Sequence, residues 1–154
     1  MSTSVSARER TASDVPLPLF LAWFVAFAAT LGALFIGEVL GQTPCVLCWY
    51  QRIAMFPLAL VLGVACLTDD RRVGRYALPL ALAGGAIALY HSLLYAGLVE
   101  EAIVPCSRTG PSCTDKAMLV FGRLPLPYLS LASFAAIVVL LVVSRLRHPP
   151  PGHH

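Results

Sequence analysis

The sequence predicts an all-α integral membrane protein, a bundle of four transmembrane helices with both termini cytoplasmic and two short outer loops. The first observation is composition: of 154 residues, 58% are hydrophobic and only 12% are charged, whereas an ordinary soluble domain has about 25% charged residues. The second is the grouping of apolar residues into four runs without Asp, Glu, Lys or Arg, at residues 15–37, 53–68, 76–99 and 124–144.

The lengths of these runs predict the bounds of the helices. A helix rising 1.5 Å per residue needs about 20 residues to cross a hydrocarbon core of roughly 30 Å. Three of the runs hold 23, 24 and 21 residues and are long enough as they stand. The run at 53–68 holds only 16, so its helix is expected to begin near Cys48 and to cover 48–68. The first run is longer than the apolar part of a secretory signal, about 7–15 residues, and is expected to stay in the mature protein.

The remaining segments predict a single membrane domain with two tails. Residues 1–14 and 146–154 are rich in small, polar or proline residues and are expected to be cytoplasmic tails. The membrane domain is expected to span 15–145. Its one substantial extramembrane segment is the outer loop 100–123, in which the short apolar stretch 117–121 is suited to lie in the headgroup region.

The basic residues predict the orientation, because such residues near helix ends translocate poorly. With a cytoplasmic N-terminus, that side holds seven arginines: Arg8, Arg10, Arg71, Arg72, Arg75, Arg145 and Arg147. The opposite side holds four basic residues: Arg52, Arg108, Lys116 and Arg123. The formal net charge of +3 comes mainly from this bias. It does not predict nucleic-acid binding, because no basic stripe is interleaved with exposed aromatic residues.

Two pairs of cysteines are expected to carry the chemistry. Cys45 and Cys48 precede the second span, and Cys106 and Cys113 lie in the outer loop, so both pairs face the compartment in which disulfides persist. Vicinal thiols in so apolar a chain indicate redox chemistry at a membrane surface. The helix N-terminus favours a thiolate at Cys48. Arg52, one turn deeper on the same face, is suited to hold an anionic or carbonyl-bearing redox partner, with snorkelling to the headgroups as the alternative.

Other interpretations of the cysteines remain open. All four thiolates together offer a zinc site, which would make the chain a non-catalytic membrane metal-binding protein. The six residues between Cys106 and Cys113 exceed the spacing of about two to four that is usual in zinc knuckles. That spacing favours a small disulfide-closed turn around Gly110-Pro111. A further alternative makes both pairs structural staples only.

A family resemblance covers residues 17–143. Residues 45–52 read CVLCWYQR, preceded by Pro44 and followed by Pro57. With the LYH triplet at 89–91, the compact 105–113 loop, and the FG and PYL motifs near the fourth span, this stretch resembles the disulfide bond formation protein B family (DsbB). It is most similar to the short BdbC type. The WYQR continuation is less similar to the vitamin K epoxide reductases, whose membrane bundle also carries two cysteine pairs.

The resemblance implies an enzyme of the bacterial cytoplasmic (inner) membrane that reoxidises a DsbA-like, thioredoxin-fold thiol oxidase and passes the electrons to membrane quinone, either ubiquinone or menaquinone. It implies redox-active disulfides Cys45–Cys48 and Cys106–Cys113. The partner's thiolate would attack Cys106, the released Cys113 would attack Cys45, and Cys48 would be left as a thiolate beside the quinone. Arg52 corresponds to the family's quinone-associated arginine.

Several single residues add weaker signals. His91, in the outer half of the third span, is suited to bond a quinone oxygen or shuttle its protons, or else to make an interhelical hydrogen bond. Gln51 and Glu38 are candidates for lining the site. Cys66, near the cytoplasmic end of its helix, is expected to be a small packing residue. Gly84-Gly85 is expected to let two helices approach closely.

Overall fold

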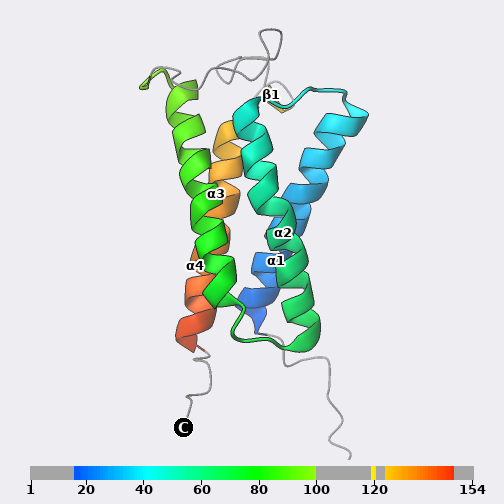
Figure 1. Ribbon diagram of the computed structural model, residues 1–154, viewed down its shortest axis with the longest axis vertical. Coiled ribbons are helices and arrows are strands. Elements are labelled where there is room, and N and C mark those ends of the chain that lie inside the picture. Colours follow the sequence, from blue (N-terminus) through cyan, green and yellow to red (C-terminus); the bar gives the residue numbers. More distant parts are fainter. Residues whose placement is uncertain (1–15, 100–118, 121–123, 148–154) are drawn as a thin grey trace, which may run out of the picture.

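Four long helices form an antiparallel bundle (Figure 1). The structure is a computed structural model that describes residues 16–99, 119–120 and 124–147. The helices are α1 (Leu17–Leu34), α2 (Val46–Thr68), α3 (Gly74–Tyr95) and α4 (Leu126–Arg147). A π-helical turn, η1 (Phe35–Val39), prolongs α1. Each helix packs mainly against its two neighbours in the ring α1–α2–α3–α4, so the predicted four-helix bundle is confirmed.

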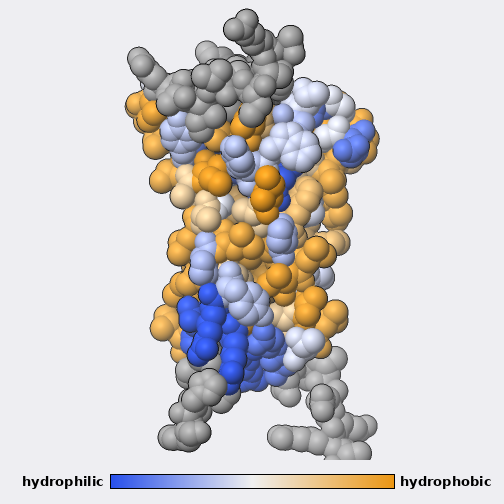
Figure 2. Space-filling view, viewed as in Figure 1, coloured by the Kyte–Doolittle hydropathy of each residue, from blue (hydrophilic) through white to orange (hydrophobic). Residues whose placement is uncertain are grey.

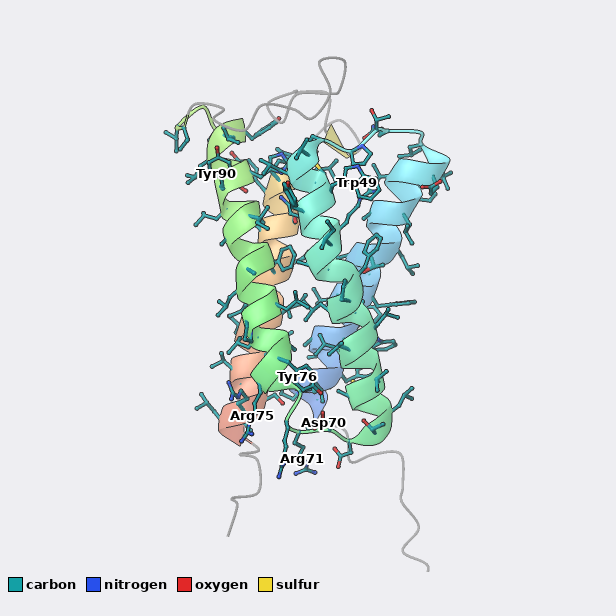
Figure 3. The ribbon with its side chains drawn as sticks, in the orientation of Figure 1. Trp49, Asp70, Arg71, Arg75, Tyr76 and Tyr90 are labelled. Carbon is teal, nitrogen blue, oxygen red and sulfur yellow. The ribbon has the colours of Figure 1, made fainter. Side chains whose placement is uncertain are left out.

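The outer surface of the bundle suits a lipid environment. All four helices are long and apolar enough to cross a membrane. On α2, Leu60 and Leu67 keep 73% and 88% of their surface exposed. Figure 2 shows apolar side chains along the sides of the bundle and the largest hydrophilic patch at its lower end. Figure 3 places Asp70, Arg71 and Arg75 at that end. Since lipid tails are as apolar as leucine, such sides are stable only inside a bilayer.

The first two helices differ from the predicted bounds for local reasons. The first begins at Leu17 rather than 15 because Pro16 is its N-cap. It continues through η1, past the predicted end at 37, and the chain turns only at Gly41, whose φ is +63°. The second begins at Val46 rather than 48, because Cys45 provides the cap. The predicted start at 48 came from the length needed to cross the hydrocarbon core, which sets only the minimum length of this helix.

The third helix begins at Gly74 and ends at Tyr95, not at 99. Apolar residues continue beyond that point, but Gly97 adopts a φ of +73° and the N–H of Leu98 donates to the carbonyl of Leu93 at 3.0 Å. Such a glycine-based cap satisfies carbonyls that the last turn leaves open. The predicted end of this helix at 99 was therefore wrong, because backbone geometry and not hydropathy decides where α3 ends.

A two-residue ladder precedes the fourth helix. β1 (Leu119–Val120) pairs antiparallel with β2 (Leu124–Pro125), so α4 starts at Leu126 rather than at 124. The predicted surface stretch 117–121 falls within the described residues only at 119–120. At its other end α4 continues beyond 144 to Arg147, because basic residues in a last turn interact favourably with the helix dipole.

The middle of the bundle is packed around one large ring. Phe134 of α4 is fully buried, and a Cβ added at Gly84 of α3 would overlap that ring and lie 3.0 Å from the Cβ of Ala54 on α2. A Cβ at Gly85 would lie 3.6 Å from Phe134, an ordinary contact. The predicted close approach is thus confirmed at Gly84, whereas Gly85 does not require it.

Candidate functional site

The first cysteine pair lies where α2 begins. Cys45 has an extended backbone (φ −69°, ψ 171°) and its sulfur accepts the backbone N–H of Cys48, with an N–S distance of 3.4 Å. Its thiol donates to the Cys48 sulfur, and the two sulfurs are 3.0 Å apart. A disulfide needs about 2.05 Å, so a movement of about 1 Å would close the bond. Helix capping therefore also holds the two sulfurs close together.

The two sulfurs differ in their surroundings. Cys45 keeps only 2% of its surface exposed, whereas Cys48 is partly exposed. Cys45 precedes the membrane span, and its hydrogen bond to Cys48, followed by burial, raises the pKa of the Cys45 thiol to about 12. When the reduced pair loses one proton, the remaining proton therefore stays on Cys45.

A buried histidine joins the pair to α3. His91 is completely buried, and Gln51, 7% exposed, lies beside it. The amide nitrogen of Gln51 is 3.0 Å from Nδ1 of His91. An amide nitrogen only donates, so Nδ1 accepts and Nε2 carries the ring proton. That Nε2 lies 3.9 Å from the sulfur of Cys45. The expected interhelical hydrogen bond is thus present, and the same ring contacts the cysteine pair.

The guanidinium of Arg52 bridges α2 and α1. Its Nη2 donates to the carbonyl oxygen of Ala33 at 2.9 Å, and its Cζ lies 5.7 Å from the centre of the Trp49 ring. A Cβ at Gly37 would come within 3.2 Å of Nη2, so the glycine leaves room for the cation. Among the described residues no carboxylate lies within ion-pair distance of Arg52. Its positive charge is therefore held between helices without a neutralising partner there.

A cavity of about 220 Å³ opens beside these groups. Its polar lining includes Cys48, Gln51 and Arg52 of α2 and His91 of α3. Cys45 lies outside the lining. The apolar wall includes Met55, Phe56, Leu126, Leu129 and Phe134. One sulfur of the pair therefore faces a mostly apolar cavity together with a cation.

Sequence reasoning missed the contribution of α4 to this cavity. Ser130 and Ser133 line it together with Phe134. Two serines three residues apart on one face of an apolar run were a usable signal. Met55 and Phe56 of α2 also line the cavity. Glu38 does not belong to the lining.

The remaining cysteines stand apart from this cluster. Cys106 and Cys113 lie outside the described residues, so their pairing and the four-thiolate site stay predictions. Cys66 packs against the main core cluster, as expected. Among the described residues, the ligand atoms of Cys45, Cys48 and His91 all lie within 4.8 Å of one another.

Comparison with known proteins decides between the redox families. The sequence model described as "Disulfide bond formation protein DsbB" matches residues 16–144, nearly the whole membrane domain. The chain belongs to this family. It is therefore a multi-pass membrane protein of disulfide bond formation. The resemblance of the CVLCWYQR segment and the four spans to DsbB is confirmed.

Relatives from several bacteria support the short BdbC-type likeness. A "Probable disulfide formation protein" of Metapseudomonas resinovorans is 54% identical, over 86% of this chain and 92% of the relative. The "Disulfide bond formation protein C" of Bacillus subtilis (strain 168) is 39% identical, over 80% and 88%. A "Probable disulfide formation protein" of Deinococcus radiodurans is 40% identical, over 86% and 92%. No solved structure matches the chain.

Proposed function

We propose that this DsbB-family protein reoxidises a DsbA-like, thioredoxin-fold thiol oxidase and passes the electrons to ubiquinone or menaquinone. The observation that carries the proposal is the position of Cys48, which lines the cavity with Arg52 while its sulfur lies 3.0 Å from that of Cys45. One face of the pair meets a lipid-soluble acceptor, and the other meets the outer cysteines. The proposed reaction sustains disulfide formation in exported proteins.

The residues around the cavity fit a quinone head group. At about 220 Å³ the cavity is smaller than the roughly 300–1,000 Å³ of sites for drug-sized ligands, which suits a single ring with its isoprenoid tail lying among the lipids. Arg52 and His91 offer N–H donors for carbonyl oxygens, and Met55, Phe56 and Phe134 offer apolar walls. A bound quinone supplies an acceptor for two electrons and two protons.

The cysteines of this chain carry the electrons in two exchanges. A thiolate of the reduced partner attacks the Cys106–Cys113 disulfide at Cys106 and forms a mixed disulfide. The partner's second thiol then attacks this bond, which frees Cys106 and leaves the partner oxidised. Cys113, freed as a thiolate, attacks Cys45 and displaces Cys48 as a thiolate. Cys106 then attacks the Cys113–Cys45 bond at Cys113, which re-forms the outer disulfide and leaves Cys45 and Cys48 reduced. Re-forming their disulfide releases two electrons and two protons, which balances the oxidation of one partner dithiol.

His91 and Gln51 assist at Cys45 in this scheme. The ring nitrogen Nε2, which carries the ring proton, faces the Cys45 sulfur at 3.9 Å, so it is placed to donate a hydrogen bond to a Cys45 thiolate when the disulfide opens. Gln51 holds the opposite ring nitrogen at 3.0 Å. Their burial keeps water away from this contact. Arg52, beside Cys48, stabilises negative charge that develops on the sulfur or on a bound carbonyl oxygen.

The redox direction requires an acceptor more oxidising than ordinary thiol pools. The proposed partner oxidase is of a strongly oxidising class. The reduction potential of DsbA is about −120 mV, and its reoxidation ends at quinone. For a two-electron couple about 30 mV corresponds to roughly 1.4 kcal/mol. Glutathione-like pools therefore cannot recharge such a partner, whereas an acceptor dissolved in the bilayer beside Cys48 can.

We place both termini in the cytoplasm and the cysteine pair at the opposite surface of the bacterial cytoplasmic membrane. The arginines at the far end of the bundle support this, since Arg71 and Arg75 lie opposite Trp49 (Figure 3). A thiol reagent that cannot cross membranes is expected to label reduced Cys48 in intact spheroplasts. Labelling that occurs only in inverted vesicles would reverse the orientation.

The central experiment follows quinone absorbance while a reduced thioredoxin-fold oxidase is supplied to the purified protein. We expect quinone to be consumed, with one partner disulfide formed for each quinone. In Cys106→Ser this consumption stops with the protein partner but continues with a small dithiol that reaches Cys45–Cys48 directly. A wild-type protein that consumes no quinone from either donor contradicts the proposal and favours the metal-binding alternative.

Replacing Arg52 with histidine is expected to weaken quinone binding. A hydrogen bond to a charged group contributes roughly 1.5–3 kcal/mol, so the KM for quinone should rise on the order of 10-fold or more. The measurement is the quinone dependence of the initial rate with a small dithiol as donor. Arg75→His, an exposed arginine at the opposite end (Figure 3), serves as the matched control. Unchanged quinone kinetics in Arg52→His would remove Arg52 from the site.

A further inference from the structure

The reduced cysteine pair and the buried histidine have the composition of a soft-metal site. The sulfurs of Cys45 and Cys48 and a ring nitrogen of His91 lie within 4.8 Å of one another. Two thiolates and one imidazole select Zn²⁺ or Cu⁺ over hard cations such as Mg²⁺. We propose that the reduced form of this pair, together with His91, binds one thiophilic metal ion, and that this ion blocks re-formation of the Cys45–Cys48 disulfide.

The distances between these atoms suit a tetrahedral ion after small side-chain movements. With Zn–S bonds of about 2.3 Å and a Zn–N bond of about 2.0–2.1 Å, tetrahedral angles place two sulfurs about 3.8 Å apart and a sulfur about 3.6 Å from the nitrogen. The observed separations are 3.0 Å between the sulfurs and 3.9 Å between Cys45 and Nε2 of His91. Widening the first by about 0.8 Å is within the reach of side-chain rotation.

The fourth ligand position and the entry path come from the cavity. Cys48 and His91 both line it, so the fourth coordination position of an ion held between them faces the cavity. A site with three protein ligands and an exchangeable fourth position is typical of accessible zinc centres. Two thiolates neutralise a divalent ion, so the occupied site carries no net charge that burial would penalise.

Gln51 provides the outer support that metal-binding histidines require. A histidine ligating through Nε2 carries its proton on Nδ1 and donates it to an acceptor. Gln51 now donates to Nδ1 from its amide nitrogen at 3.0 Å. A flip of the amide presents the side-chain oxygen instead, so the same residue stabilises the ring both in the metal-free and in the metal-bound form. On binding, the two thiol protons leave and the ring proton moves from Nε2 to Nδ1.

The proposed site is redox-gated by its own chemistry. Only thiolates bind the ion, so the Cys45–Cys48 disulfide excludes it, and the bound ion in turn holds both sulfurs away from each other. The site differs from a four-thiolate site because it needs neither Cys106 nor Cys113. It does not depend on the proposed quinone reaction, since metal binding by the reduced pair requires no acceptor or partner.

The test measures Zn²⁺ binding to the detergent-purified full chain carrying Cys66→Ser, Cys106→Ser and Cys113→Ser. After reduction and removal of the reductant we expect one Zn²⁺ per chain, and none after oxidation. Co²⁺ used as a probe should show sulfur-to-metal charge-transfer absorption. Adding Cys48→Ser should abolish binding.

A second set of variants tests His91 and its support. Because His91 is completely buried and its replacement can unfold the chain, Gln51→Leu is tested beside His91→Leu. Loss of the outer support in Gln51→Leu is expected to weaken Zn²⁺ binding roughly 10–100-fold.

Three results would overturn the proposal: no Zn²⁺ in the reduced triple variant, Zn²⁺ bound only when Cys106 and Cys113 are present, or unchanged affinity in a folded His91→Leu protein. For the functional consequence, Zn²⁺ added to the reduced wild-type protein should stop quinone consumption until a chelator is added. If quinone is not consumed even without Zn²⁺, the proposed function fails while the binding result stands.

Discussion

Replacing Cys48 with serine is expected to reduce quinone consumption to the uncatalysed background. Serine cannot form the disulfide whose closure releases the two electrons, and it removes the sulfur that lines the cavity. The measurement supplies a small dithiol as donor, so the result does not depend on the partner oxidase or on the outer cysteines. Quinone should still bind to the variant, because Arg52 and the apolar walls of the cavity remain.

Cys66→Ser is the matched control for this variant. Cys66 lies on the same helix and packs against the main core cluster, so the same chemical change there should leave the rate close to that of the wild type. Quinone consumption that persists in Cys48→Ser would show that the electrons leave by another sulfur and would refute the role assigned to this cysteine.

Replacing Gly84 with alanine is expected to give the largest loss of stability among small substitutions. The added Cβ would overlap the fully buried ring of Phe134 and press on Ala54. Overpacking of this kind costs roughly 1–3 kcal/mol. Because Phe134 also lines the cavity, the displaced ring should raise the KM for quinone as well. Thermal unfolding in detergent measures the first effect and initial rates the second.

Gly85→Ala provides the comparison one residue away. Its Cβ would lie 3.6 Å from Phe134, an ordinary contact, so the unfolding temperature should change little. Gly84→Ala combined with Phe134→Leu should recover part of the stability, because the smaller side chain vacates the overlapping space. Equal effects at the two glycines would contradict the close packing of α3 against α4.

The fold was predictable because lipid imposes a strong constraint on sequence. Backbone groups inside a bilayer must bond within their own helix, so four long apolar runs in one chain leave few alternatives to four helices. Helix ends were less predictable. Apolar residues continue past Tyr95, yet Gly97 ends α3 through its positive φ. The start of α2 depends on the sulfur of Cys45 accepting a backbone N–H.

The candidate site was predictable where its residues are close in sequence. The four-residue spacing of Cys48 and Arg52 puts them on one helical face, and both line the same cavity. The role of His91 was open, because hydropathy does not say which helix a buried ring meets. The structure places it between Gln51 and Cys45.

By itself, the sequence determined the four spans, the family and the position of a cysteine pair at the start of the second helix, since each depends on local composition or spacing. Only the tertiary structure decided which sulfur faces the cavity, which residues of α4 complete its wall, and that His91 contacts Cys45. The physical reason is that helices without a hydrophobic driving force between them pack by shape. The contacts of small residues such as Gly84 therefore set the positions of side chains distant in sequence.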